Sequence, residues 1–220
     1  MKTFLSLGAG PGIGLATAER FAKEGFHVVL ASRDVAKTHE LAERLIAREY
    51  KASVRRVDAS NPRSVMEMVA DVQKQHGSID VLHYNAASPR KATLYEQPLD
   101  SFNADLAVNI GGALVAAQAV TPKMEAQKSG TILLTGGGFA LAPNPDYLSI
   151  SIGKAGLRAL AQGLFEPLRE KGIHVGTVTV CTFVSPASNE ASAVAEHFWQ
   201  LYGQPKDSWT VEVIYSPASA

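Results

Sequence analysis

Residues 3–25 read TFLSLGAGPGIGLATAERFAKEG, and this stretch decides the fold. An apolar run at 3–9 ends in glycines, and an amphipathic segment from about Gly12 to Lys23 follows without a linker. The first pattern is typical of a short buried strand and the second of a helix. A second apolar run, GFHVVLAS at 25–32, comes directly afterwards. A strand, a helix and a strand joined by short turns predict a βαβ unit, in which the two strands lie parallel.

The same alternation continues to the end of the chain. Further strands are expected at 52–60, 79–87, 130–137, 173–183 and 209–215, and further helices at 35–49, 64–77, 101–127, 145–170 and 190–202. Repeated alternation predicts the α/β class, with a Rossmann-type doubly wound parallel sheet flanked by helices on both faces. No linker, repeat or low-complexity segment interrupts the pattern, so we expect residues 1–220 to form a single domain.

The composition excludes several classes of function. Of the 220 residues, 46% are hydrophobic and 19% are charged, which is ordinary for a globular protein. Twenty-one basic residues balance twenty-one acidic residues, so no net charge favours nucleic acid or an anionic membrane as a partner. Cys181 is the only cysteine, which excludes an internal disulfide and fits a reducing, cytoplasmic compartment.

Motifs for metals and membranes are also missing from the sequence. There is no CxxC or HExxH spacing, so we expect no metal site. The first residues run straight into the glycine turn without the apolar region of a secretory signal. No stretch approaches the roughly 18 apolar residues of a membrane span. We therefore expect a small-molecule substrate and neither a membrane nor nucleic acid.

The glycine turn has the spacing of a dinucleotide site. Gly8, Gly12 and Gly14, with Gly10 and Ile13 between them, follow a strand and open a helix. A pyrophosphate needs a tight turn, a backbone without side chains and the free N–H groups of a helix start, all of which this stretch predicts. The alternative is a turn that only reverses the chain.

The end of the second strand bears on the choice of dinucleotide. An acidic residue there would bind the ribose hydroxyls of NAD, but the sequence has Ser32 and Arg33. A hydroxyl and a guanidinium suit a 2′-phosphate, which favours NADP(H) over NAD(H). Alternatively, Arg33 is simply a solvated loop residue, for which Asp34 is a candidate partner. Asp58 either accepts a hydrogen bond from the adenine amino group or caps the helix that follows it.

Five motifs together resemble one family over almost the whole chain. They are the Gly8-xxx-Gly12-x-Gly14 turn, YNAA (84–87), VNIGGAL (108–114), LLTGG (133–137) and KAGLRAL (154–160). In these motifs the sequence resembles the short-chain dehydrogenase/reductases. The resemblance implies that Asn85 and Ala86 line the cofactor, and that Asn109 holds a water of a proton relay through a local helix distortion. It also implies that Lys154 binds the nicotinamide ribose and lowers the pKa of a catalytic tyrosine.

The family's acid/base pair is replaced in this sequence. The tyrosine of the family lies four residues before the lysine, where this chain has Ile150. The catalytic serine of the family lies about thirteen residues before that tyrosine, which corresponds to Gly137. The Pro-Gly pair that shapes the nicotinamide pocket becomes Cys181-Thr182. Reduction of a carbonyl needs a proton donor, and isoleucine and glycine side chains cannot supply one.

Tyr147 is the candidate replacement, provided that Asn144 caps the helix and Tyr147 lies in its first turn. Seven residues then separate it from Lys154 on nearly the same helix face, but they rise about 10.5 Å, which argues against direct contact. Thr135, Ser149 and Ser151 are weaker alternatives. Tyr147 either acts as the catalyst or only lines the pocket or an interface.

These observations lead to three hypotheses. The first is an NADP(H)-dependent short-chain oxidoreductase that acts on a carbonyl or alcohol with an altered proton donor. The second is a catalytically inactive NADP(H)-binding protein that serves as a sensor or assembly partner, and the third is a structural subunit with an empty site. Small residues crowd the segments 101–127 and 155–163, so we also expect a homodimer or homotetramer that pairs through these helices.

Overall fold

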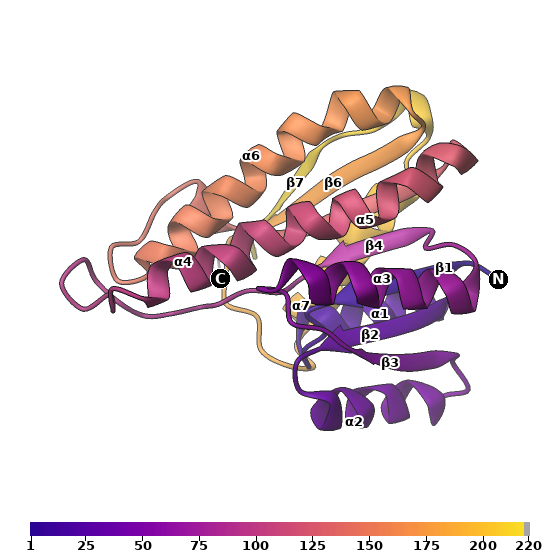
Figure 1. The fold of residues 1–220 in the computed structure, drawn as a ribbon, viewed down its shortest axis with the longest axis horizontal. Coiled ribbons are helices and arrows are strands. Elements are labelled where there is room, and N and C mark those ends of the chain that lie inside the picture. Colours follow the sequence, from indigo (N-terminus) through magenta and orange to yellow (C-terminus); the bar gives the residue numbers. More distant parts are fainter. Residues whose placement is uncertain (218–220) are drawn as a thin grey trace.

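Seven strands form one parallel sheet in the computed structural model, which describes residues 1–217 (Figure 1). The strand order is β3-β2-β1-β4-β5-β6-β7. The strands are β1 (Thr3–Leu7), β2 (His27–Ser32), β3 (Ala52–Arg56), β4 (Val81–Tyr84), β5 (Gly130–Gly137), β6 (Ile173–Val180) and β7 (Glu212–Tyr215). This order is that of a doubly wound α/β fold and confirms the predicted class. Residues 218–220 of the predicted domain lie outside the described part.

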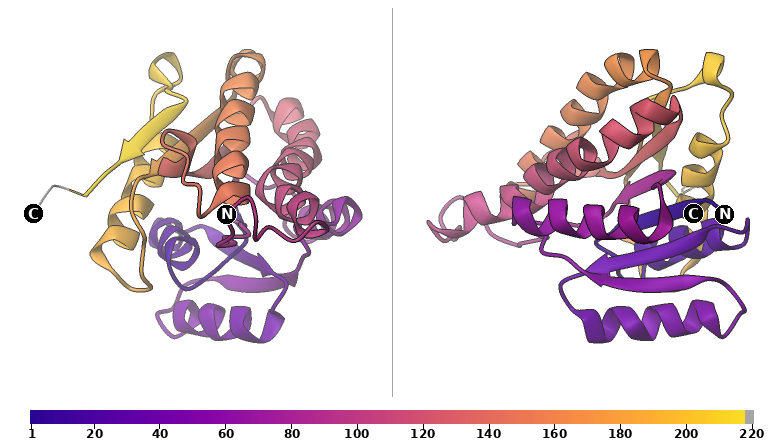
Figure 2. Two further views of the ribbon diagram at one scale, coloured as in Figure 1. Left: turned by 90° about the vertical axis from the view of Figure 1, so that its left-hand side faces the viewer. Right: turned by 45° about the vertical axis from the view of Figure 1, so that its right-hand side comes forward.

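Helices cover both faces of the sheet (Figure 2). One layer consists of α1 (Ile13–Ala22), α2 (Val35–Ile46) and α7 (Asn189–Tyr202). The other consists of α3 (Pro62–His76), α4 (Ser101–Leu106), α5 (Gly112–Gln127) and α6 (Leu148–Glu170). Because each central strand is covered on both sides, β1, β4 and β6 are buried along their whole length, as their continuous apolar runs predict.

The topology places a crevice between β1 and β4. The chain winds from β1 through β2 to β3 on one side, then crosses to β4 on the other side of β1. The connections after β1 and β4 therefore leave the sheet in opposite directions, and ligands of such folds bind outside the carboxyl ends of these strands. Gly8 follows β1 and Asn85 follows β4, so both lie at this position.

The start of α6 differs from the sequence-based prediction. Asn144 was expected to cap the helix, but its side-chain oxygen accepts from the backbone N–H of Asp146 at 2.9 Å and closes a turn. The backbone N–H of Ala92 donates to the carbonyl of Asp146, which ties this turn to the connection after β4. The helix begins only at Leu148, with Tyr147 at the N-cap position. The prediction that Tyr147 lies on the helix is therefore wrong.

The predicted helix at 101–127 is continuous but distorted, because a π-helix (Ala107–Gly111) separates α4 from α5. An 18-residue window in this stretch reaches a mean hydropathy of 1.3, which by length and composition is enough for a membrane span. The expectation that no stretch approaches this limit is corrected, because it overlooked how apolar a helix rich in alanine becomes. The fold buries 44% of the window, and a single such helix is weak evidence for a membrane.

We predict that Gly8→Ala destabilises the fold by about 2–4 kcal/mol, whereas Gly10→Ala does not. Gly8 has a φ of +86°, and a Cβ there would lie 2.3 Å from the backbone nitrogen of Ala86. A Cβ at Gly10 would meet no atom within 4 Å. Urea unfolding of the two variants measures the difference. Equal midpoints would show that the turn does not require its close approach to β4.

Candidate functional site

The glycine turn after β1 is held between the ends of the two strands that flank β1, namely β2 and β4. The backbone N–H groups of Gly8 and Ala9 both donate to the carbonyl of Ala31 at the end of β2. On the other side, the Asn85 side chain donates to the carbonyl of Gly8 at 2.9 Å. A Cβ on Gly14 would lie 3.1 Å from the Cα of Ala9, so this glycine lets α1 pack closely on the turn. The sequence predicted the turn and the position of Asn85, and the structure brings them together.

The open side of the turn has the form of a phosphate cradle. A Cβ on Gly12 would meet only the carbonyl of Val184, at 3.7 Å, and Gly10 faces open space. Gly12 is the N-cap of α1, no side chain caps the helix, and its first turn, which starts at Ile13, carries no acidic residue. The free N–H groups and the positive end of the helix dipole suit a pyrophosphate. The residues present therefore fit a dinucleotide.

Ser32 and Arg33 lie at the carboxyl end of β2, where the adenosine end of a dinucleotide was expected. Arg33 is exposed, which agrees with the alternative of a solvated loop residue, but Asp34 pairs with Lys37 at 3.3 Å and not with Arg33. The Ser32 hydroxyl lies 2.6 Å from that of Thr38, which places it against the start of α2. Ser32 is thereby oriented by the helix, while the guanidinium remains available at the surface.

Asp58 lies at the same edge of the sheet. Its carboxylate accepts from the hydroxyl and the backbone N–H of Ser60, and Asn61 is the residue that caps α3. The alternative of Asp58 as the helix cap is therefore wrong. The Ser60 hydrogen bonds, helped by the charges of Arg33 and Arg56, hold the pKa of the Asp58 carboxyl below its usual value. Asp58 is thus an anionic acceptor on the side of the crevice where Arg33 lies.

Lys154 lies at the carboxyl end of β5. Its Nζ donates to the carbonyl of Thr135 at 2.6 Å, and its stem passes over Gly137. Burial lowers the pKa of the Lys154 ammonium to about 8. The hydroxyl of Thr135 lies 3.0 Å from His83 Nε2, and burial followed by the charge of Lys154 lowers the pKa of His83 to about 3. His83 is therefore a neutral, fully buried histidine of the core.

Tyr147 and Ile150 have different surroundings. The ring of Tyr147 stacks on that of Phe139, with centroids 5.5 Å apart, and lies 6.4 Å from the ring of Phe183. Ile150 is only 5% exposed and packs as a core residue. Ser151 donates to the carbonyl of Tyr147 and thereby supports the first turn of α6. These contacts make Tyr147 part of an aromatic cluster at the carboxyl edge of the sheet.

Asn109 lies in the π-helix, so the expected helix distortion is present. Its Oδ1 accepts from the backbone N–H of Ser88 at 2.7 Å. Its Nδ2 is buried and finds no hydrogen-bond partner among residues 1–217. A Cβ on Gly153 would lie 2.5 Å from the Cβ of Asn109, so this glycine brings α6 against the asparagine. An unsatisfied buried donor beside Gly153 is a place where a water or ligand oxygen gains a hydrogen bond.

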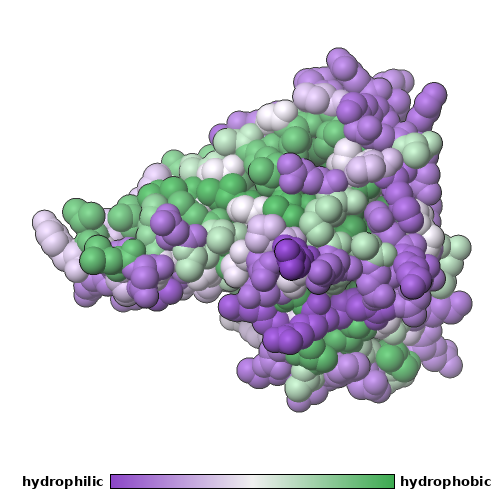
Figure 3. All heavy atoms as spheres, in the orientation of Figure 1, coloured by the Kyte–Doolittle hydropathy of each residue, from purple (hydrophilic) through white to green (hydrophobic). Residues whose placement is uncertain are grey.

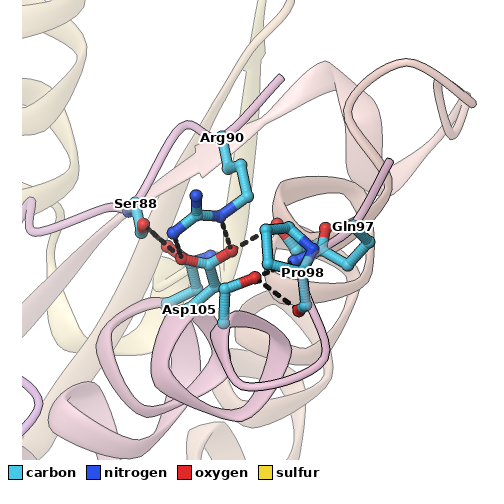
Figure 4. A network of polar contacts seen from close by, with 8 residues as sticks. Ser88, Arg90, Gln97, Pro98 and Asp105 are labelled. Atoms are coloured by element: carbon cyan, nitrogen blue, oxygen red, sulfur yellow. Dashed lines mark hydrogen bonds and ion pairs between the residues drawn. The ribbon is translucent and has the colours of Figure 1, made fainter. Parts of the chain in front are cut away.

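A buried carboxylate that the sequence analysis missed joins the segments around this site (Figure 4). Asp105 in α4 is 2% exposed and accepts from the Ser88 hydroxyl at 2.6 Å, from Arg90 Nε at 2.8 Å and from the Ser149 hydroxyl at 2.9 Å. Ser88 also positions Asn109 through its backbone N–H. The available signal was an aspartate among small and apolar residues of a helix expected to be buried.

Opposing effects act on the pKa of the Asp105 carboxyl. Burial raises it, but the hydrogen bonds from Arg90, Ser88 and Ser149 outweigh burial, so the net pKa lies below the usual value. Asp105 is therefore ionised at neutral pH. It connects the loop after β4, α4 and the first turn of α6 in one network.

A family model described as short chain dehydrogenase matches residues 2–195. The chain belongs to this family. An uncharacterised oxidoreductase of Staphylococcus saprophyticus is 30% identical over 194 residues, which is 86% of this chain and 81% of that protein. A short-chain dehydrogenase structure from Rhodopseudomonas palustris has a TM-score of 0.89 and 28% identity, with 98% of both chains covered.

A second solved structure is that of a metagenomic short-chain oxidoreductase in complex with NADP. It has a TM-score of 0.91 and 26% identity, and the match covers 99% of this chain and 98% of that one. The glycine cradle, Asn109 and Lys154 of this short-chain dehydrogenase therefore lie in a fold that it shares with solved members of the family. Among the described residues, 1–217, no group of three or more histidine, cysteine or acidic side chains is placed to bind a metal.

We predict that Asp105→Asn lowers the free energy of unfolding by about 2 kcal/mol at pH 7, because the buried Ser149 hydroxyl and the ion pair lose their carboxylate acceptor. Ser149→Ala, which leaves the carboxylate with its other donors, is the control and has a smaller effect. Because folding lowers the pKa of Asp105, its contribution is present above about pH 4 and is lost as the pH falls through the folded-state pKa. Urea unfolding between pH 3 and pH 7 measures this. A loss that is independent of pH would contradict an ionised Asp105.

Proposed function

We propose that the protein is an NADP(H)-dependent oxidoreductase that interconverts a carbonyl and an alcohol with a proton donor other than a tyrosine at position 150. The observation that carries this proposal is the open cradle of Gly10 and Gly12 at the start of α1. It lies at the switch point of the sheet, beside Asn85 and on the same edge as Lys154. Named relatives that are oxidoreductases support the reaction class.

The preference for NADP(H) rests on charge at the end of β2. Arg33 is exposed and is not held by Asp34, whose partner is Lys37. A guanidinium binds a phosphate through charge-assisted hydrogen bonds, and the Ser32 hydroxyl adds a neutral partner. The metagenomic relative was solved in complex with NADP, which agrees with this preference but describes that protein.

The chemistry of the chain follows from the residues around Lys154. A bound nicotinamide dinucleotide would supply the hydride. Lys154 holds a proton at Nζ next to the carbonyl of Thr135, and Asn109 offers an unsatisfied N–H where it packs against Gly153 of α6. Ile150 and Gly137 contribute no titratable group at the positions of the family tyrosine and serine. Lys154 and Asn109 therefore remain to bind and orient the reactants.

One observation favours a second function, in which the protein binds NADP(H) without turnover as a sensor or assembly partner. Ile150 is packed in the core with 5% exposure, so this position is closed to a reacting group. The two functions differ in one measurement. With NADPH and a panel of aldehydes and ketones, the oxidoreductase consumes NADPH, whereas the sensor binds it and leaves it reduced.

We predict that Arg33→Ala raises the Kd for NADPH by about 10- to 100-fold, because one charge-assisted phosphate contact is worth about 1.5–3 kcal/mol. The Kd for NADH should remain unchanged, since NADH lacks the 2′-phosphate, and it serves as the control ligand. Fluorescence titration measures both constants. Equal weakening of the two cofactors would assign Arg33 to a general structural role and contradict the preference for NADP(H).

We also propose a homodimer that pairs through α5 and α6. Leu114 on α5 and Ile152 on α6 are each 40% exposed. Figure 3 shows apolar residues gathered over these helices, while most of the rest of this face is hydrophilic. An exposed apolar patch of this kind is typical of a contact surface.

We predict that Leu114→Glu with Ile152→Glu yields a monomer, because two buried carboxylates would face each other at the contact. Ile46→Glu is the control, since Ile46 on α2 is similarly exposed, at 45%, but lies in the other helix layer. Multi-angle light scattering at micromolar concentration gives the mass of each variant. A wild-type protein that is already monomeric contradicts the dimer.

A further inference from the structure

The stem of Lys154 lies close to the space that a side chain at Gly137 would need. A Cβ built on Gly137 would lie 3.2 Å from Cγ of Lys154 and 3.4 Å from its Cδ and Cε. The stem thus lies against the glycine, and Nζ ends on the carbonyl of Thr135 at 2.6 Å. A serine here would press on the lysine. The absence of a side chain at Gly137 therefore allows the stem of Lys154 to lie where it does.

The hydroxyl groups near Lys154 are already engaged. Ser149 donates to Asp105, and Ser151 donates to the carbonyl of Tyr147. The Thr135 hydroxyl is paired with the neutral His83 in the interior. The neighbours of the Tyr147 ring are phenylalanines, which carry no group that stabilises a phenolate. Lys154 is a titratable group at the carboxyl end of β5, where its Nζ donates to a backbone carbonyl.

We infer that the Lys154 ammonium is itself the proton donor of the reaction, in place of a tyrosine. This inference rests on the proposed oxidoreductase function. As a hydride adds to the carbonyl carbon, the C=O π bond breaks and its electron pair moves to oxygen. The new O–H bond forms with a proton of Nζ, and the N–H bond electrons remain on nitrogen as a neutral amine. A proton from solvent restores the ammonium, so charge and atoms balance over the cycle.

The ionisation of Lys154 agrees with this role. Burial lowers the pKa of the ammonium to about 8, and a general acid works best with a pKa close to the operating pH. Around α6, Asp105 is paired with Arg90, Arg158 with Glu212 and Glu166 with Arg169, while burial lowers the pKa of both His83 and His174. Glu170, at the far end of α6 from Lys154, has no ion-pair partner among residues 1–217. Loss of solvation, rather than a neighbouring cation, is therefore the main cause of the low pKa.

The proposed role of Lys154 predicts how the rates of reduction and oxidation depend on pH. Reduction needs the ammonium, so the rate of carbonyl reduction should fall as the pH rises through about 8. Oxidation of the alcohol needs the neutral amine, so its rate should rise over the same range.

Two measurements test the inference, the first without any cofactor. Trace labelling with acetic anhydride between pH 6 and pH 11, read by peptide mass spectrometry, gives the pKa of the Lys154 amine, with the exposed Lys37 as reference in the same spectra. We expect the Lys154 labelling to follow a pKa of about 8. Labelling that follows the ordinary value of about 10.4 overturns the inference.

The second measurement separates cofactor binding from proton transfer. Lys154→Arg keeps a cation that donates hydrogen bonds, but a guanidinium with a pKa above about 12 does not release a proton. We expect Lys154→Arg to bind NADPH with a Kd within about threefold of wild type, and to lose at least about 100-fold in turnover of an aldehyde and ketone panel. Tyr147→Phe is the matched control and should keep its turnover.

The outcomes distinguish this inference from the function on which it rests. Loss of turnover in Tyr147→Phe, with activity retained in Lys154→Arg, assigns the proton to the tyrosine and overturns the inference. If the wild type binds NADPH without turnover, the inference about Lys154 is also overturned, but the proposed cofactor site is not. Failure of the wild type to bind NADPH in the fluorescence titration overturns the proposed function itself.

Discussion

The contact between the glycine turn after β1 and the end of β4 is the constraint on which the site depends. Gly8 approaches Ala86 so closely that no side chain fits between them, and Asn85 fastens the turn through its amide. This contact holds α1 with its N-terminus toward the crevice. The positive end of the helix and the free N–H groups then face the place where a pyrophosphate fits. The adenosine and nicotinamide ends of the site extend from this point.

Two further glycines shape the opposite end of the site by leaving room for functional side chains. Gly153 admits Asn109 against α6, and Gly137 admits the stem of Lys154 against β5. The buried Asp105 connects the loop after β4 with α4 and α6, so hydrogen bonds tie these segments together. The position of the Lys154 stem against Gly137 is the structural basis for the proposal that the lysine supplies the proton.

Much of this could be predicted from the sequence, because the fold follows from local patterns. The strand runs and the glycine spacing each predict a feature that the structure contains, and the family resemblance implies the helix distortion at Asn109. The start of α6 was missed because Asn144 and Asp146 form a turn that resembles a helix cap in sequence. The Asp105 network was missed because its partners are brought together only by the tertiary fold, and spacing along the chain does not reveal them.

The most direct test of the account is a crystal structure of the protein with NADP⁺ bound. The account predicts that the pyrophosphate contacts the N–H groups at the start of α1, and that Nζ of Lys154 lies within about 3 Å of the position a carbonyl oxygen takes beside nicotinamide C4. A cofactor that lies away from the glycine turn would contradict it. So would a structure in which the Tyr147 hydroxyl, rather than the lysine, occupies that position.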